Sequence, residues 1–251
     1  MIPRLRMLAG PNGSGKSTLA RQLTDDYAVN LYKYLNADML FAEISQSCKT
    51  ACPFGVDNQD LLDFINNSTY PESCKIPFRE HLITIDEDDY FVFAPQAINS
   101  YTVAMAADFF KDQYLKRHLS FSFETVFSHP AKIEILKKAQ AEGFRTYMYF
   151  VATESPNVNV KRIQQRVKDG GHNVPEDKTV ARYYRCLEQI KYALPYLNRA
   201  YFFDNSGDQS LFFAEYELGK GFQLYSELVP EWFRHYVLGE CDLFNLTAQR
   251  G

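Results

Sequence analysis

The sequence predicts an α/β fold in which a parallel sheet carries helices on both faces. Short apolar strands alternate with helical stretches along the 251-residue chain, which is the pattern of a parallel sheet. A glycine-rich run, Gly10 to Thr18, lies between the first predicted strand and the first predicted helix. Beyond Gln209 the pattern changes, because two apolar stretches flank Gly219-Lys220. We therefore expect the sheet to be followed by a C-terminal hairpin and a final helix.

The glycine-rich run matches G-x-x-x-x-G-K-[ST], the loop that surrounds the β- and γ-phosphates of a nucleoside triphosphate. Its glycines permit a tight turn that aims backbone N–H groups inward, where a Cβ atom would obstruct the phosphates. Lys16 supplies a positive charge to the phosphate oxygens, and the Ser17 hydroxyl is placed to bind Mg²⁺. We therefore expect a P-loop NTPase- or kinase-like sheet that binds ATP or GTP with Mg²⁺ through Gly10, Pro11, Asn12, Gly13, Ser14, Gly15, Lys16, Ser17 and Thr18.

The first elements surround this loop and then give way to an irregular stretch. Residues 3–9 are a short apolar run that predicts the strand leading into the loop, and Ser17 to Leu23 opens a helix whose N-terminus favours an anion. Residues 30–35, rich in Leu and Tyr, predict a second strand, and a helix is expected over 37–44. Between 45 and 93 the periodicity weakens and prolines interrupt the chain, so we expect an insertion of short helices and loops there.

The rest of the chain is more regular. Gly143 and the pair Gly170-Gly171 each follow a helical pattern, as helix-ending glycines do. The expected elements are a helix over 95–117, a strand over 120–124, a helix over 130–142, a strand over 144–152, helices over 157–167 and 176–197, a strand over 199–204, a hairpin over 211–218 and 221–226, and an amphipathic helix over 229–238. Residues 1–251 thus predict a single P-loop kinase-like domain, with an insertion at about 45–93 and a C-terminal extension at about 209–251.

Composition narrows the classes of partner. A net charge of −4 and a pI near 5.8 argue against a sequence-wide surface for nucleic acid or anionic membrane. No stretch is long and apolar enough to cross a bilayer. Because the phosphate loop begins at Gly10, residues 2–9 are needed as its strand and leave no room for a cleavable signal peptide. We therefore expect a cytoplasmic protein, in which the odd count of five cysteines indicates reduced thiols.

Ligands of an open parallel sheet bind beyond the carboxyl ends of its strands, and acidic residues fall there repeatedly. Asp38 follows the second predicted strand, Glu124 ends the next, and Asp204 follows the last. Asp38 is placed to accept a proton from a substrate hydroxyl or to hold Mg²⁺ through water, although an Asp there also suits a helix N-cap. Glu124 and Thr125 are expected in the same site, because a buried carboxylate is costly unless it is paired. We expect one crevice beside the phosphate loop to collect these carboxylates.

Basic residues form a second group, on the two helices that flank the glycine pair of segment 168–175. They are Arg162, Arg166, Arg182 and Arg185. The arrangement predicts a closing lid that brings guanidinium groups onto the transferring phosphoryl group. We expect Arg166 and Arg182 to touch phosphate, whereas arginines of this kind otherwise form surface salt bridges. His172, beside the hinge glycines, is a candidate ligand contact or a turn cap.

The sequence lacks the additional signatures that define other classes of nucleotide-binding protein. ABC-type ATPases require Leu-Ser-Gly-Gly-Gln and an apolar run ending in Asp-Glu, and GTPases use Asn-Lys-x-Asp to select guanine; the sequence contains none of them. What remains is a small phosphotransferase whose chain supplies both loop and lid. A kinase of another nucleotide, of a nucleoside or of a nucleic-acid end stays open, as does a non-catalytic ATP-dependent switch module.

Several short motifs occur in a fixed order between residues 5 and 206. They are Asn36-Ala37-Asp38, Ser122-Phe123-Glu124-Thr125 followed by Ser128, Arg166-Val167, Gly170-Gly171-His172 with Val174-Pro175, Arg182-Tyr183 and Asp204-Asn205-Ser206. Together with the phosphate loop they resemble the zeta-toxin family, and are most similar to its chromosomal branch of small P-loop kinases.

The resemblance implies phosphorylation of a UDP-N-acetylamino sugar by ATP or GTP, typically UDP-N-acetylglucosamine at its 3′-hydroxyl. It implies Asp38 as the general base, Glu124 and Thr125 as sugar contacts, and Arg166 and Arg182 as catalytic arginines beside Lys16. Further candidate contacts to the substrate are Asn36, Arg162, His172 and Arg185. A small antitoxin protein is the partner that such a toxin would have.

Overall fold

The chain divides into two units in the computed structural model, which describes residues 2–171 and 173–239. The first unit consists of Met1–Tyr34 and Ser120–Gly251, and the second of Leu35–Leu119. The expected insertion at 45–93 lies within the second unit, which also contains the helices on either side of it. The description of the chain as one domain with an insertion stays a prediction.

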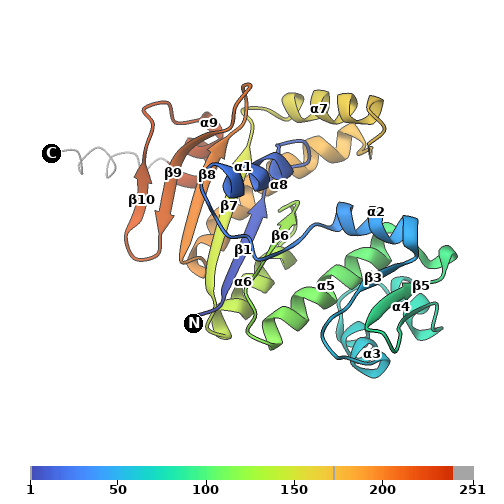
Figure 1. The fold of residues 1–251 in the computed structure, drawn as a ribbon. Coiled ribbons are helices and arrows are strands. Elements are labelled where there is room, and N and C mark those ends of the chain that lie inside the picture. The colour runs from blue at the N-terminus through green and yellow to red at the C-terminus, as the bar shows by residue number, and fades with distance from the viewer. Residues whose placement is uncertain (1, 172, 240–251) are drawn as a thin grey trace. The chain divides into compact units, whose positions relative to one another are not determined.

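A seven-stranded sheet organises the first unit (Figure 1). Its order is β10-β9-β8-β7-β1-β6-β2, and β1 pairs in parallel with both β6 and β7. β8 continues the parallel part beside β7, whereas β9 and β10 add an antiparallel hairpin. The strands are β1 (Arg4–Ala9), β2 (Lys33–Leu35), β6 (Phe121–Thr125), β7 (Arg145–Ala152), β8 (Arg199–Asp204), β9 (Leu211–Glu217) and β10 (Gly221–Leu224). The predicted parallel sheet and C-terminal hairpin are therefore confirmed.

Helices cover both faces of this sheet. Leu8 and Val151 pack with Leu19 of α1 on one face. Side chains alternate along a strand, so Phe150 points to the other face, where its ring lies 5.8 Å from that of Trp232 in the C-terminal helical segment. The helices of the unit are α1 (Lys16–Asp25), α6 (Ala131–Ala141), α7 (Pro156–Lys168), α8 (Glu176–Ala193) with the 3₁₀ turn Leu194–Tyr196, and α9 (Glu231–Phe233), which continues as a π-helical turn over Arg234–Leu238. The helices expected from the sequence thus form within a few residues of their expected bounds.

The second unit is built on a small antiparallel sheet of order β3-β5-β4. Phe91 of β5 is fully buried and lies 5.6 Å, ring to ring, from Phe109. The elements are α2 (Ala37–Ser47), β3 (Lys49–Ala51), α3 (Asn58–Asn67), α4 (Glu72–Arg79), β4 (Ile83–Ile85), β5 (Tyr90–Phe93), the 3₁₀ turn Pro95–Ala97 and α5 (Ser100–Lys116). The sequence analysis expected only short helices and loops between 45 and 93. Three- and four-residue strands are too short to produce a readable alternation, so the sheet was missed.

Predicted and observed helix ends differ where a capping side chain determines the residue at which the helix begins. The helix expected from residue 95 begins only at Ser100, because Asn99 caps it and its side chain accepts the N–H groups of Tyr101 and Thr102. Among the described residues, no helix combines the length and apolarity that a bilayer-spanning segment needs.

Candidate functional site

The phosphate loop leaves the carboxyl end of β1 and enters α1, at the centre of the parallel strands (Figure 1). Gly10 and Gly15 have φ angles of 152° and 94°, a region that favours glycine. A Cβ atom on Gly10 would lie 2.1 Å from the carbonyl oxygen of Val151, and one on Gly15 would lie 2.2 Å from Nδ2 of Asn205. Gly10 therefore needs glycine for its backbone angle and for lack of space against backbone, whereas at Gly15 the backbone angle is joined by a clash with a side-chain amide.

Lys16 and Ser17 meet one carboxylate. The register of β1 and β6 sets Glu124 opposite Leu8, at the strand ends beside the loop. The Ser17 hydroxyl donates to Glu124 Oε2 at 2.9 Å, and Lys16 Nζ lies 4.0 Å from Glu124 Oε1. The hydroxyl of Tyr34 also donates to Glu124, at 2.7 Å. Glu124 thus lies next to the serine that was predicted to bind Mg²⁺.

The side chains of the loop are chemically suited to a triphosphate and its metal ion. Lys16 is only 6% exposed and donates from Nζ to the carbonyl oxygen of Pro11 at 2.8 Å, so its charge stays at the loop. The Ser14 hydroxyl is buried and makes no hydrogen bond within the part of the chain that the structure describes. A hydroxyl beside a carboxylate is a donor set that Mg²⁺ accepts. The residues present therefore fit the expected ion and the expected phosphates.

Two asparagines hold the outer side of the loop; Asn205 belongs to a motif found in the sequence, without a role predicted for it, and Asn159 was not predicted. Asn159 of α7 donates from Nδ2 to the carbonyl oxygen of Asn12 at 2.6 Å. Asn205, just after β8, donates from Nδ2 to the carbonyl oxygen of Ser14 at 2.8 Å. Asn159 could have been found from its position, because it interrupts the buried stripe of Pro156, Val160 and Ile163 along its helix.

The arginines on the two helices separate into different environments. Arg182 of α8 reaches the loop, where Nη1 lies 3.4 Å from Oδ1 of Asn12. Arg185 is exposed and donates from Nε to the carbonyl oxygen of Ala181 in its own helix. Arg162 of α7 donates to the carbonyl oxygen of Gly207 at 3.1 Å. The structure thus joins Arg182 to the phosphate loop, whereas the hydrogen bond of Arg185 stays within its own helix.

The segment between these helices begins with glycines that end α7. Gly170 has a φ of 87°, and the N–H of Gly171 donates to the carbonyl oxygen of Arg166 at 2.8 Å. A Cβ on Gly171 would lie 2.6 Å from Cγ of Arg166, so the turn packs directly on this side chain. His172 lies outside the described residues. A lid role for the segment stays a prediction.

Among the other predicted site residues, some have a local structural role that does not depend on a ligand. Asn36 caps α2, because its Oδ1 accepts the N–H groups of Asp38 and Met39. Asp38 is exposed in the first turn of α2, in the second unit. Thr125 is largely buried at the end of β6. Asp204, expected in the same crevice, accepts Trp232 Nε1 at 2.8 Å and the N–H of Ser206 at 3.0 Å, so its carboxylate anchors the C-terminal helical segment.

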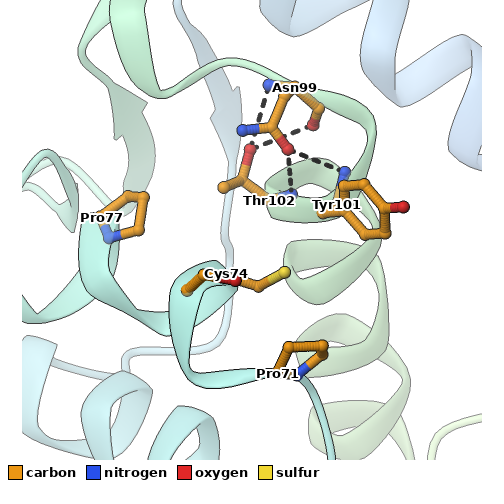
Figure 2. A pocket seen from close by; sticks show the side chains of 7 residues that line it. Pro71, Cys74, Pro77, Asn99, Tyr101 and Thr102 are labelled. Atoms are coloured by element: carbon orange, nitrogen blue, oxygen red, sulfur yellow. Dashed lines mark hydrogen bonds between the residues drawn. The ribbon is translucent and has the colours of Figure 1, made fainter.

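A separate hollow of about 400 Å³ lies in the second unit, between α4 and the start of α5 (Figure 2). Its lining consists of Pro71, Ser73, Cys74, Pro77, Asn99, Tyr101 and Thr102. The polar groups of Asn99 and Thr102 are used in the cap of α5, since the Thr102 hydroxyl donates to Ala97 and its backbone N–H to Asn99. This wall therefore offers a ligand little polar recognition.

Comparison with known proteins supports the fold. No protein-family model matches the chain. An uncharacterized protein of Haemophilus influenzae is 33% identical over 69 residues, which cover 28% of this chain and 49% of that protein. The native crystal structure of the AvrRxo1-ORF1:-ORF2 complex contains a similar chain, with a TM-score of 0.53, 15% identity, and coverage of 95% of this chain and 66% of that one. The same complex with sulphate ions gives a TM-score of 0.52 at 15% identity, covering 89% and 61%.

These likenesses define a class rather than a particular protein. The chain spans about half of its curated relative and less than two thirds of the solved chains. At such low identity the structural match concerns the fold alone. The chain has an α/β fold like that of P-loop kinases, with a mainly parallel sheet flanked by helices and a glycine-rich loop between β1 and α1.

Proposed function

We propose that this protein is an ATP- or GTP-dependent kinase that transfers the γ-phosphate to an alcohol group of a small molecule. The convergence of Lys16, Ser17 and Glu124 at a glycine-lined loop carries the proposal. Lys16 would neutralise the β- and γ-phosphate oxygens, and the loop amides would hold them. Mg²⁺ would be held by Ser17 and Glu124, and when bound it would offset charge on the β- and γ-phosphates. Glu124 would then serve the metal ion in addition to its predicted contact with the acceptor.

Transfer needs a base for the acceptor, and we propose Asp38. It follows β2, which lies next to β6 in the sheet, and ligands of such sheets bind beyond the strand ends. Asp38 would take the proton of the acceptor hydroxyl as that oxygen forms its bond to the γ-phosphorus and the bond to the bridging β–γ oxygen breaks. ADP or GDP would leave, and Arg166 and Arg182 would neutralise the charge on the transferred group.

The acceptor proposed from the sequence resemblance is a UDP-N-acetylamino sugar, typically UDP-N-acetylglucosamine. Thr125, Asn36, Arg162, His172 and Arg185 remain its candidate contacts. An inhibitory antitoxin protein remains the proposed partner. The solved AvrRxo1 neighbour is itself a complex of two gene products, which is consistent with a paired arrangement.

A mass-spectrometric acceptor screen tests the function. Purified protein with MgATP would be offered UDP-N-acetylglucosamine, other UDP-sugars, nucleosides and oligonucleotides. We expect a phosphorylated UDP-N-acetylamino sugar, lost in Lys16→Ala and Asp38→Ala. Asp63→Ala is the matched control, because Asp63 is also an exposed aspartate on a helix of the second unit.

The outcomes of this screen separate the alternatives. A labelled nucleoside or oligonucleotide would show a kinase with a different acceptor. ATP-dependent capture of a protein with no labelled acceptor would show a switch module and contradict the kinase proposal. Full activity in Asp38→Ala would remove Asp38 from the mechanism while leaving nucleotide binding in place.

A further inference from the structure

The outer side of the phosphate loop poses a problem of hydrogen bonding. A loop that aims its N–H groups at phosphate must turn carbonyl oxygens the other way, and buried carbonyls need donors. Two of these carbonyls, on Asn12 and Ser14, accept side-chain amides from outside the loop. The donors come from different elements, α7 and the end of β8. The loop is thus held at alternate residues from two directions.

The amide of Asn159 is oriented by matched partners at both ends. Asn159 is fully buried, and its Nδ2 donates to Asn12 at 2.6 Å. Its Oδ1 is hydrogen-bonded to the hydroxyl of Thr153, which is also fully buried. The carbonyl oxygen of Thr153 in turn accepts the Tyr183 hydroxyl at 2.5 Å. A flipped amide would face oxygen with oxygen at Asn12, so only one orientation satisfies both contacts.

The amide of Asn205 is fixed by its backbone. Its N–H donates to the carbonyl oxygen of Ala152 at 2.8 Å, which ties the residue to the end of β7. Its Nδ2 then donates to Ser14 at 2.8 Å. The same atom would lie 2.2 Å from a Cβ at Gly15, so the glycine makes room for this contact.

We infer that Asn159 and Asn205 are positioning residues that hold the phosphate loop in its anion-binding conformation before nucleotide arrives. The inference rests on the proposed function, in which this loop binds the triphosphate. Neither side chain needs to touch the nucleotide. Each acts by holding a carbonyl oxygen outward, so that the amides of the loop stay directed inward. Such preorganisation raises affinity because ordering of the loop is not needed at the moment of binding.

The loop contact also extends toward the helix that carries Arg182. Asn12 receives Asn159 on its backbone carbonyl and Arg182 on its side-chain oxygen. Loss of the Asn159 contact should therefore disturb the position of Asn12 and its hydrogen bond to Arg182 together. Asn205 has no such link to an arginine through Ser14 among the contacts of the described residues, so the two variants need not be equal.

Isothermal titration with three probes tests the inference. The probes are MgATP, inorganic tripolyphosphate and adenosine, which separate the phosphate loop from the nucleoside site. In Asn159→Asp and Asn205→Asp a carboxylate oxygen replaces the donor and repels the loop carbonyl. We expect the dissociation constants of MgATP and tripolyphosphate to rise about 10- to 100-fold, with that of adenosine unchanged. Asn157→Asp, an exposed change in the same helical turn as Asn159, should bind all three as wild type does.

A general loss of folding would weaken every probe alike, and the uncharged variants Asn159→Leu and Asn205→Leu should show the same selective loss, which separates loss of the donor from repulsion of phosphate by a new charge. Asn205 is half-buried, and its variant keeps the test usable if the charge at Asn159 prevents folding. Wild-type phosphate affinity in Asn205→Asp together with wild-type affinity in any folded Asn159→Asp would overturn the inference. A wild-type protein that binds MgATP, shows these losses in the variants, and phosphorylates no acceptor would refute the kinase proposal and leave the inference standing.

Discussion

The two units of the chain differ in the role of the polar side chains that they bury. In the first, buried polar groups, among them Asn159, Thr153 and Ser14, surround a stretch of backbone. Both units bury aromatic rings, among them Phe150 and Phe202 in the first and Phe91 and Phe109 in the second, so the polar groups around the loop are what distinguishes the first unit. Polar groups in a core are costly unless every one is satisfied. Their position around the loop, where the Asn159 amide donates to a loop carbonyl, indicates that the first unit uses polar groups to fix a backbone geometry.

The difference between the two units predicts which substitutions should reduce ligand binding and which should reduce the stability of the fold. Around the phosphate loop, small changes of shape or of one hydrogen bond should reduce ligand binding more than folding. In the aromatic core of the second unit, a change should reduce folding in proportion to the volume that it removes. Matched substitutions in the two units can test this contrast.

The largest effect is expected from Gly10→Ala. The added Cβ would lie 2.1 Å from the Val151 carbonyl oxygen, so the loop must move, and we expect MgATP binding to be lost in titration calorimetry. Gly55→Ala is the counterpart in the second unit, where φ is also positive, at 57°, but no atom lies within 4 Å of the new Cβ. That variant should lose only about 1–2 kcal/mol of stability through backbone strain. Retained MgATP affinity in Gly10→Ala would show that the loop is more adaptable than its packing indicates.

Phe91→Ala should have the next largest effect. Its ring is fully buried and lies 5.4 Å from Phe110 and 5.6 Å from Phe109. Truncation should lower the free energy of unfolding by about 3–5 kcal/mol, measured by urea titration followed with circular dichroism. Tyr101→Ala is the control in the same unit, because Tyr101 is 62% exposed. A loss from Tyr101→Ala as large as that from Phe91→Ala would contradict an aromatic core as the source of stability.

Glu124→Gln should separate metal binding from phosphate binding. The amide cannot supply the charge that Mg²⁺ needs, so the Mg²⁺ concentration for half-maximal ATP binding should rise about 10- to 100-fold. In EDTA, without Mg²⁺, the substitution should leave the affinity for ATP unchanged or raise it, because it removes a negative charge near the phosphates. Titration of ATP with and without Mg²⁺ measures both.

Glu134→Gln supplies the control for this experiment. Glu134 is exposed on α6 and pairs with Lys137 at 2.8 Å, away from any loop contact. It should leave both titrations unchanged. An equal loss of ATP affinity for Glu124→Gln with and without Mg²⁺ would show that Glu124 supports the loop and does not hold the metal.

The sequence predicted the parts of the molecule that local patterns encode. The phosphate loop follows from residues adjacent in the chain, and the long strand at Arg145–Ala152 follows from its apolar run. The contact of Glu124 with Ser17 depends on the register between β1 and β6, which joins residues 107 positions apart and leaves no local trace. The burial of Asn159 could be read from its helical stripe, but its partner could not, because Asn12 is 147 positions away. The role of Asp38 stays a prediction.

The smallest effect is a pH dependence that the two units should share. Burial raises the pKa of the Cys186 thiol in the first unit to about 12, although Lys16 opposes the shift. Burial likewise raises the pKa of the Cys52 thiol in the second unit to about 12. Both folded-state values lie above that of an unfolded thiol, about 8.5. The stabilisation is therefore complete below about pH 8.5 and decreases as pH rises toward 12, because the unfolded chain releases protons first.

Urea unfolding between about pH 8 and 9 measures this slope where tyrosines, with unfolded pKa values near 10, contribute little. Each buried thiol should lower the free energy of unfolding by up to about 1.4 kcal/mol per pH unit, and Cys186→Ala and Cys52→Ala should each reduce the total slope by a similar amount.

Iodoacetamide at mild alkaline pH should label half-buried Cys48 and Cys74 in the folded protein and spare Cys52 and Cys186. Rapid labelling of Cys186 would show that α8, the helix that carries Arg182, opens readily. The contrast between a rigid polar site and an aromatic core would then have to be abandoned.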